Sequence, residues 1–308
     1  METGIDPKVD YAFKRVFAGV ESADILPNLL NAVLMWPSDK CVTSVEILNP
    51  FSQKETLEDK QIILDIKARD KRGDVFLIEM QMVARPLFPE RLLFYLAKNY
   101  SQQLVQSEEW TLLRPVIVIC FIDDVLCPET TDYHGRYEMR DSHTGVRLSD
   151  HWTIHVFELP KFHKPVGELS SDLDRWIYFL QHGQELDPDS LPSALQTPPV
   201  HLATKVLQNM SHDTLERHQY EARQRFLRDQ ATSLAFAEEK GRVEGREEGR
   251  EEEARRMVIR IGKTRLWPPP TEIVARLNLI KSLERIESLG DRILDCPDWD
   301  ALLEGVAE

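Results

Sequence analysis

Two apolar segments separated by a short polar turn limit the folds open to this chain more than any other feature. Residues 60–68 (KQIILDIKA) and 75–83 (VFLIEMQMV) have the length and the aliphatic, β-branched content of strands. The residues between them are polar and include Gly73. This pattern predicts a β-hairpin.

Segments on both sides of the hairpin predict a mixed α/β fold. Apolar residues at three- and four-residue spacing predict helix within residues 7–35, and Pro27 is expected to break this run into two helices. Residues 42–48 favour a short strand. Residues 90–105 have helical periodicity, and the apolar run 115–122 is typical of a strand covered on both faces. Strand, helix and strand in this order suggest a right-handed crossover.

The remainder of the chain is expected to be mainly helical. A further strand is predicted at residues 153–158, and it ends in a Leu-Pro pair where the pattern changes. Residues 166–230 have mainly helical character. The polar, proline-containing stretch 187–199 is predicted to be a linker or an exposed loop.

Residues 236–256 (FAEEKGRVEGREEGREEEARR) form a low-complexity segment in which glycines recur every four residues. On a helix these glycines would share one face, and the Arg and Glu residues between them exclude a lipid setting. Two interpretations stay open, a solvated helical connector and a self-association stripe. Apolar positions between residues 273 and 303 predict a small helical unit with an accessory role.

Composition argues against several classes of protein. No apolar run approaches the roughly 20 residues of a membrane span, and the N-terminal residues lack the pattern of a signal peptide, so a cytoplasmic location is expected. The four cysteines form no CxxC pair, which argues against a zinc site and a disulfide framework. The formal charge of −14 disfavours a nucleic-acid partner unless local basic patches or a bound cation offset it.

Acidic residues interrupt both apolar strands of the predicted hairpin. Side-chain alternation places Asp65 and Lys67 on one face of the first strand, and Glu79 and Gln81 on one face of the second. An unpaired charge in such apolar strands would cost several kcal/mol, so something should neutralise it. One interpretation is a bound divalent cation. The other is an exposed sheet face on which the carboxylates pair with Lys67 or other basic neighbours.

A series of short motifs continues in one order through residues 5–165. They are DYAFKRVF at 10–17, LLNAVL at 29–34, ILDIKARD at 63–70, Gly73, IEMQ at 78–81, ER at 90–91, Tyr95, Lys98, Tyr100, QL at 103–104, PVIVI at 115–119 and HVFEL at 155–159. The ordered set resembles the Rpn family of recombination-promoting nucleases and putative transposases, which are PD-(D/E)XK nucleases. The stretch at residues 241–253 is similar to the tails that these proteins often bear.

The resemblance implies an α/β fold with a restriction-endonuclease-like PD-(D/E)XK core, a mixed sheet flanked by helices, followed by a mainly helical C-terminal region. It implies that Asp65 is the central metal-binding aspartate and Glu79 the second acidic ligand, while Gln81 stands where many such enzymes have lysine. Asp10 resembles the family's opening acidic position. It could be a third metal ligand or a carboxylate that stabilises its helix N-terminus. Our hypothesis is that Lys67 supplies the positive charge that Gln81 lacks.

These roles predict a Mg²⁺- or Mn²⁺-dependent endonuclease that hydrolyses double-stranded DNA with low sequence specificity, in recombination or transposition. The alternative is a catalytically silent DNA-binding or oligomeric scaffold protein that retains the nuclease fold, and a homo-oligomer would form through the C-terminal helical region. The expected domains are the nuclease core at 1–165, a helical region and linker at 166–235, a charged connector at 236–262 and a small helical accessory unit at 263–308.

Overall fold

The chain forms two compact units, Met1–Arg225 and Phe226–Glu308. A computed structural model describes residues 2–49, 65–83, 87–105 and 107–304. All strands of this description belong to the first unit, whereas the described elements of the second unit are helices.

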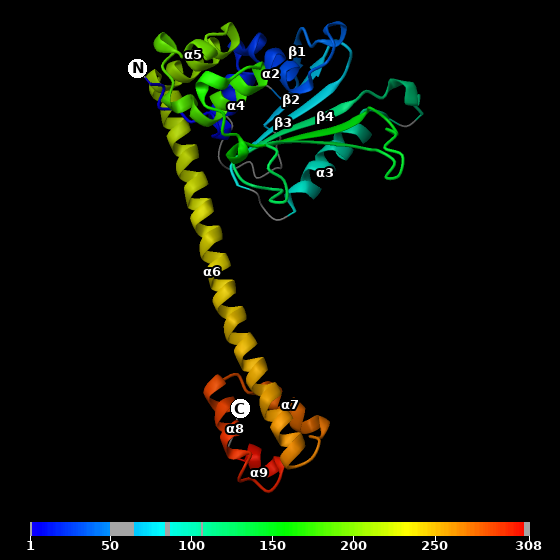
Figure 1. Cartoon of the computed structure of the whole chain (residues 1–308), viewed down its shortest axis with the longest axis vertical. Coiled ribbons are helices and arrows are strands. Elements are labelled where there is room, and N and C mark those ends of the chain that lie inside the picture. Colours follow the sequence, from blue (N-terminus) through cyan, green and yellow to red (C-terminus); the bar gives the residue numbers. More distant parts are fainter. Residues whose placement is uncertain (1, 50–64, 84–86, 106, 305–308) are drawn as a thin grey trace. The chain divides into compact units, whose positions relative to one another are not determined.

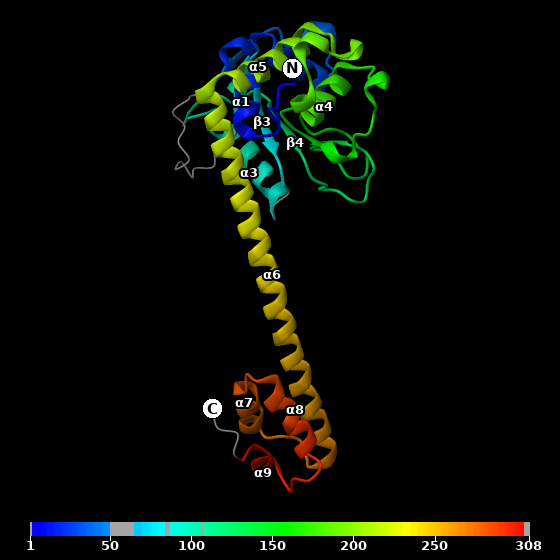
Figure 2. The same ribbon diagram turned by 90° about the vertical axis from the view of Figure 1, so that its left-hand side faces the viewer.

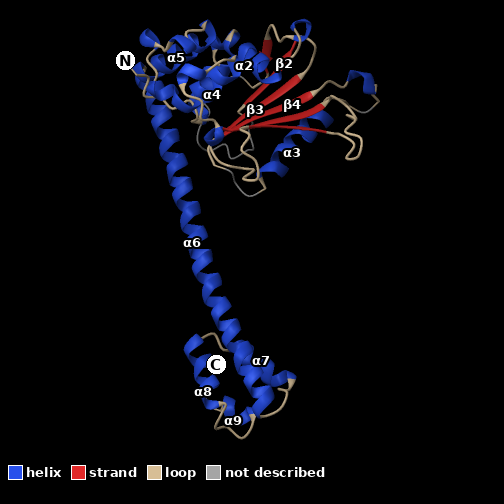
Figure 3. Ribbon diagram, in the orientation of Figure 1, coloured by secondary structure: helices blue, strands red, loops and turns tan. Residues whose placement is uncertain are grey.

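A six-stranded mixed sheet lies at the centre of the first unit, in the order β1-β2-β3-β4-β6-β5 (Figure 1, Figure 3). Strands β3, β4 and β6 run parallel, while β1, β2 and β3 are joined antiparallel and β5 is antiparallel to β6. The strands are β1 (Val45–Ile47), β2 (Ile66–Asp70), β3 (Val75–Gln81), β4 (Val116–Ile122), β5 (His134–Glu138) and β6 (Trp152–Glu158). The mixed sheet with flanking helices confirms the fold class.

Strands β2 and β3 form the predicted hairpin, with Ile66 opposite Ile78 and Lys67 opposite Leu77. Gly73 takes a φ of 92° in the turn, a backbone region that favours glycine. The first predicted strand was expected to begin at residue 60, but residues 60–64 lie outside the described residues. Asp65 lies in a bend directly before β2.

Helix α3 (Phe88–Ser101) connects β3 to β4 and covers one face of the sheet (Figure 1). Because β3 and β4 are parallel, the strand-helix-strand prediction is confirmed as a crossover connection. On this face Leu92 and Leu96 of α3 pack in one cluster with Leu77 and Val118. Every residue of β4 is buried, as the uninterrupted apolar run predicted.

Four helices belong to the layer on the opposite face, where Phe13 and Phe121 rings lie 6.2 Å apart and Phe17 contacts Trp176. The expected break at Pro27 is wrong, because the chain breaks between residues 19 and 24 and Pro27 lies in the first turn of a helix. The first-turn N–H groups have no partner within a helix, so proline costs no hydrogen bond there. The helices are α1 (Asp10–Ala18), α2 (Ile25–Leu34), α4 (Asp172–His182) and α5 (Pro198–His212).

Two local features of this unit differ from the sequence-based expectation. Strand β5 was not predicted, because its sequence HGRYE is polar and its only ladder partner within the described sheet is β6. The stretch 187–199 is less exposed than expected. Leu191 and Leu195 are buried, and α5 already begins at Pro198.

The second unit has its own apolar core. Helices α7 (Thr271–Leu279), α8 (Leu283–Arg292) and α9 (Trp299–Leu303) pack around the last part of α6 (Thr214–Arg265), as Figure 2 shows. Val258 of α6 is buried with Ile286 and Trp299. The helical unit predicted near the C-terminus is therefore present, and the glycine-rich segment is an exposed part of α6. Within the described residues, no helix is both long and apolar enough to cross a membrane.

Candidate active site

Asp65 and Glu79 meet at the open end of the β2–β3 hairpin. The Asp65 N–H donates to Glu79 Oε2 at 3.3 Å, and the Asp65 carboxylate accepts from the Met80 N–H at 2.7 Å. Both residues are buried, with exposed fractions of 8% and 7%. The two carboxylates therefore converge as the sequence predicted, and they do so away from solvent. The alternative of an exposed acidic face does not describe this pair.

Burial raises the pKa of both carboxyl groups. The pKa of Asp65 is held well above its usual range by burial and then by the charges of Glu79 and Asp10. Burial raises the pKa of Glu79 to about 7, although the Asp65 N–H, Arg91 and Lys14 act to lower it. The surrounding cations thus do not offset the cost of burying the two negative charges. Two adjacent carboxylates in this condition fit a hard divalent cation such as Mg²⁺ or Mn²⁺, because such ions take oxygen ligands and favour the ionised form.

Gln81 lies two residues beyond Glu79 on the same strand face and is held between two partners. Its amide nitrogen donates to the Val83 carbonyl at 2.9 Å, and its Oε1 accepts from Arg91 Nη2 at 2.8 Å. The same Arg91 nitrogen lies 3.8 Å from Glu79 Oε1. Arg91 is a site residue whose contacts the sequence did not reveal. In the sequence, Arg91 was noted only as part of the Glu-Arg pair in the family motif series, and no catalytic or binding role was predicted for it.

Asp10 lies at the first position of α1, and its charge reaches both buried carboxyl groups. Its own carboxylate is engaged by Arg223 of α6, which donates from Nε at 2.8 Å and also from Nη2. Within the described residues, no three His, Cys, Asp or Glu side chains are grouped so that they could hold a metal ion. A role for Asp10 as third ligand therefore stays a prediction.

Lys67 shares the strand face of Glu79 but lies opposite Leu77, two residue pairs further along the hairpin. Burial lowers the pKa of Lys67, and the charge of Arg69 lowers it further. The cations that act on Glu79 are Arg91 and Lys14, which come from α3 and α1. The predicted catalytic role of Lys67 remains a prediction, and the geometry supplies two other cations.

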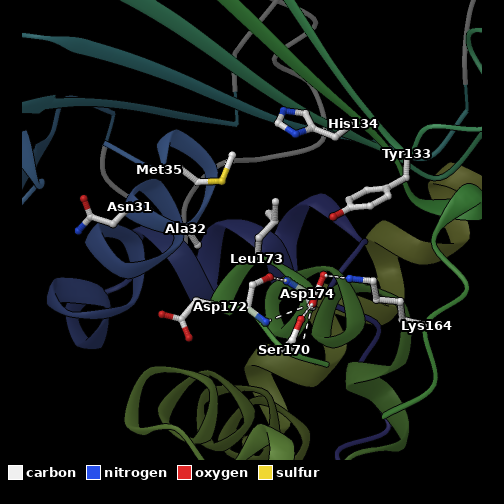
Figure 4. Close-up of a pocket in the computed structure, with 11 residues that line it drawn as sticks. Asn31, Ala32, Met35, Tyr133, His134, Lys164, Ser170, Asp172, Leu173 and Asp174 are labelled. Carbon is white, nitrogen blue, oxygen red and sulfur yellow. Dashed lines mark hydrogen bonds and ion pairs between the residues drawn. The ribbon is translucent and has the colours of Figure 1, made fainter. Parts of the chain in front are cut away.

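A hollow of about 390 Å³ lies elsewhere in the first unit, between the end of α2, the chain before β5 and the start of α4 (Figure 4). Tyr133, His134 and Lys164 line it, together with Asp174. Asp174 accepts from Lys164 Nζ at 2.9 Å and from the Ser170 and Ser171 N–H groups, so it serves to cap α4. None of the predicted site residues lines this hollow. We therefore place the candidate active site at the hairpin end.

The fold and the acidic hairpin agree with a comparison against known protein families. Residues 7–237 match the family described as PD-(D/E)XK nuclease family transposase, which is most of the chain. The chain belongs to this family. PD-(D/E)XK nucleases generally use divalent metal ions. Membership of the family supports a role related to nucleases or transposases, with DNA as the substrate class. Searches of curated proteins and of solved structures found no match.

Proposed function

We propose that this PD-(D/E)XK family member is a Mg²⁺- or Mn²⁺-dependent endonuclease that hydrolyses phosphodiester bonds in double-stranded DNA. The observation that carries the proposal is the buried contact of Asp65 with Glu79 at the hairpin end. A fold that only had to be stable would not keep two adjacent carboxyl groups there, because their ionisation opposes folding.

Each residue of the site has a distinct task in the proposed reaction. Asp65 and Glu79 would hold the ion, and the Met80 N–H fixes the orientation of the Asp65 carboxylate. When bound, the ion would activate water and offset charge on the phosphate. Gln81 carries no charge, so its contribution is to orient its neighbours through hydrogen bonds.

Nicking of supercoiled plasmid tests the proposal. We expect cleavage in Mg²⁺ or Mn²⁺, no cleavage in EDTA, and at least about a 100-fold slower rate for Asp65→Asn, because an amide is a poor ligand for a hard cation. Glu46→Gln is a matched control, since Glu46 is an exposed carboxylate on the neighbouring strand β1. It should cleave at the parental rate.

The outcome also decides between the two functions considered for the chain. Cleavage that Asp65→Asn retains would refute the proposed site. If the unsubstituted protein cleaves in neither metal but still shifts DNA in a gel, the catalytically silent DNA-binding alternative is favoured. Low sequence specificity predicts similar rates on plasmids of unrelated sequence.

A further inference from the structure

The proposed reaction requires a cation that the sequence motif does not provide. Hydrolysis adds water across one P–O bond, so that one P–O bond forms, one breaks, and negative charge builds up on the phosphate oxygens. At position 81, where many PD-(D/E)XK enzymes have lysine, this chain has neutral glutamine. A positively charged side chain from another element has to lie close to the two carboxylates.

Arg91 on α3 occupies that place. Its Nη2 reaches both Glu79, at 3.8 Å, and Gln81, at 2.8 Å, so the guanidinium lies over the acidic end of the hairpin. Its side chain is 31% exposed, which leaves part of the guanidinium open to solvent. The Nε–H is buried and, within the described part of the chain, lacks a hydrogen-bond acceptor. The exposed part of the guanidinium, and not the buried Nε–H, can bind an anion while Nη2 stays with Gln81.

Arg223 and Lys67 are less well placed than Arg91 to contact a phosphate at the two carboxylates. The guanidinium of Arg223 is bound to the Asp10 carboxylate through two nitrogens. Lys67 lies opposite Leu77 in the hairpin, and its pKa is lowered by burial and by the charge of Arg69. Lys14 on α1 acts to lower the pKa of both carboxyl groups, from a different element than Arg91.

The neutral side chain at position 81 is compatible with the positive charge of Arg91 beside it. Because Gln81 contacts the Arg91 guanidinium, a lysine at position 81 would bring a second positive charge close to it, and two cations at short separation repel. The neutral Gln81 carbonyl oxygen instead accepts from Arg91 Nη2 and holds that nitrogen near Glu79. The glutamine therefore allows the positive charge to come from the helix and not from the strand.

We propose that Arg91 is a catalytic residue that binds the scissile phosphate through its guanidinium, and that Gln81 is the positioning residue that orients it. This proposal rests on the proposed nuclease function. Arg91 transfers no proton, because arginine stays protonated in proteins. Its contribution is a fixed charge and paired N–H donors directed at the phosphate oxygens.

Substitution of Arg91 in the full chain tests this role. For Arg91→Ala, single-turnover cleavage of a duplex in Mn²⁺ should slow by about 100-fold or more, as expected for loss of a charge-stabilising donor. Arg91→Lys should recover about tenfold, since it restores the charge but not the paired geometry. Guanidinium ion added to Arg91→Ala should accelerate cleavage. Arg69→Ala, an exposed arginine of the same hairpin, is the matched control and should cleave normally.

Two further measurements separate catalysis from support of the site. Calorimetric titration with Mn²⁺ in the absence of DNA should give an affinity for Arg91→Ala within about threefold of the parent, and thermal unfolding should coincide. Gln81→Ala should slow cleavage less than Arg91→Ala and leave the response to added guanidinium absent.

The proposal is overturned if Arg91→Ala cleaves within about threefold of the parent, or if it loses Mn²⁺ affinity in proportion to its rate. Greater loss in Lys67→Ala than in Arg91→Ala would assign the charge to Lys67 instead. These results are distinct from failure of the proposed function, which would show as no metal-dependent cleavage by the unsubstituted protein and would remove both proposals.

Discussion

Replacing Glu79 by glutamine should stabilise the metal-free protein at neutral pH. The ordinary pKa of a glutamate, 4.5, applies in the unfolded chain, and burial next to Asp65 raises the pKa of Glu79 to about 7 in the folded chain. Between these values the folded state binds more protons than the unfolded state. The free energy of unfolding therefore falls as pH rises, by up to roughly 1.4 kcal/mol per pH unit.

The difference between the two pKa values corresponds to about 3 kcal/mol of stability that the parent has at pH 4 and has lost above pH 7. Glutamine fills nearly the same space and never ionises, so Glu79→Gln should lack this loss. Urea unfolding in EDTA at pH 4 to 8, read by hydrogen exchange in peptides from β3 and β4, reports the first unit specifically. The variant and the parent should agree near pH 4 and differ by about 3 kcal/mol near pH 8.

A stability difference that does not change with pH would refute the reasoning, because it would mean that Glu79 ionises normally in the folded chain. Divalent cations supply an independent check. Added Mn²⁺ should raise the stability of the parent more than that of Glu79→Gln, since a ligand that binds only the folded state stabilises it.

Two further predictions concern other parts of the chain. Burial lowers the pKa of His155 to about 3, so between pH 6.5 and 5 a proton binds to this histidine in the unfolded chain but not in the folded chain. The free energy of unfolding of the parent should therefore fall by about 2 kcal/mol over this range relative to that of His155→Phe. An equal pH dependence of the urea-derived stability of the two proteins would contradict this. In the second unit, a Cβ at Gly262 would lie 2.0 Å from Trp299, so Gly262→Ala should destabilise that unit by about 1–3 kcal/mol. A Cβ at Gly245 would have no atom within 4 Å, so Gly245→Ala should instead be neutral or stabilise α6 by about 0.5–1 kcal/mol. Hydrogen exchange in peptides of α8 compares the stability of the two variants.

The sequence predicted those features that depend on local periodicity and on pairing between neighbouring strands. The hairpin, the crossover through α3 and the buried strand β4 all have strong local patterns. The meeting of Asp65 with Glu79 then follows from the antiparallel register alone, since residue 66 lies opposite residue 78. The polar edge strand β5 has no such local pattern. It was missed because only its pairing with β6, which the sequence does not show, makes it a strand.

The cations of the site could not be predicted in the same way. Arg91 and Arg223 come from helices, and whether they reach the acidic residues depends on how α3 and α6 pack, which is a tertiary property. The helical periodicity of a sequence does not distinguish an arginine that faces solvent from one that contacts a carboxylate. The sequence therefore indicated Lys67, the basic residue closest along the strand.

The first turns of α6 form part of the first unit in a way that limits how this protein can exchange its C-terminal region. The Tyr220 hydroxyl accepts from the Asp6 N–H, Arg15 pairs with Glu216 at 3.0 Å, and Arg223 binds Asp10. A gene fusion joined before residue 214 would remove all three contacts and leave Asp10 beside the acidic pair without its arginine. A junction after Arg225 would keep them, so a different tail can be attached there while the region around Asp65 and Glu79 keeps its surroundings.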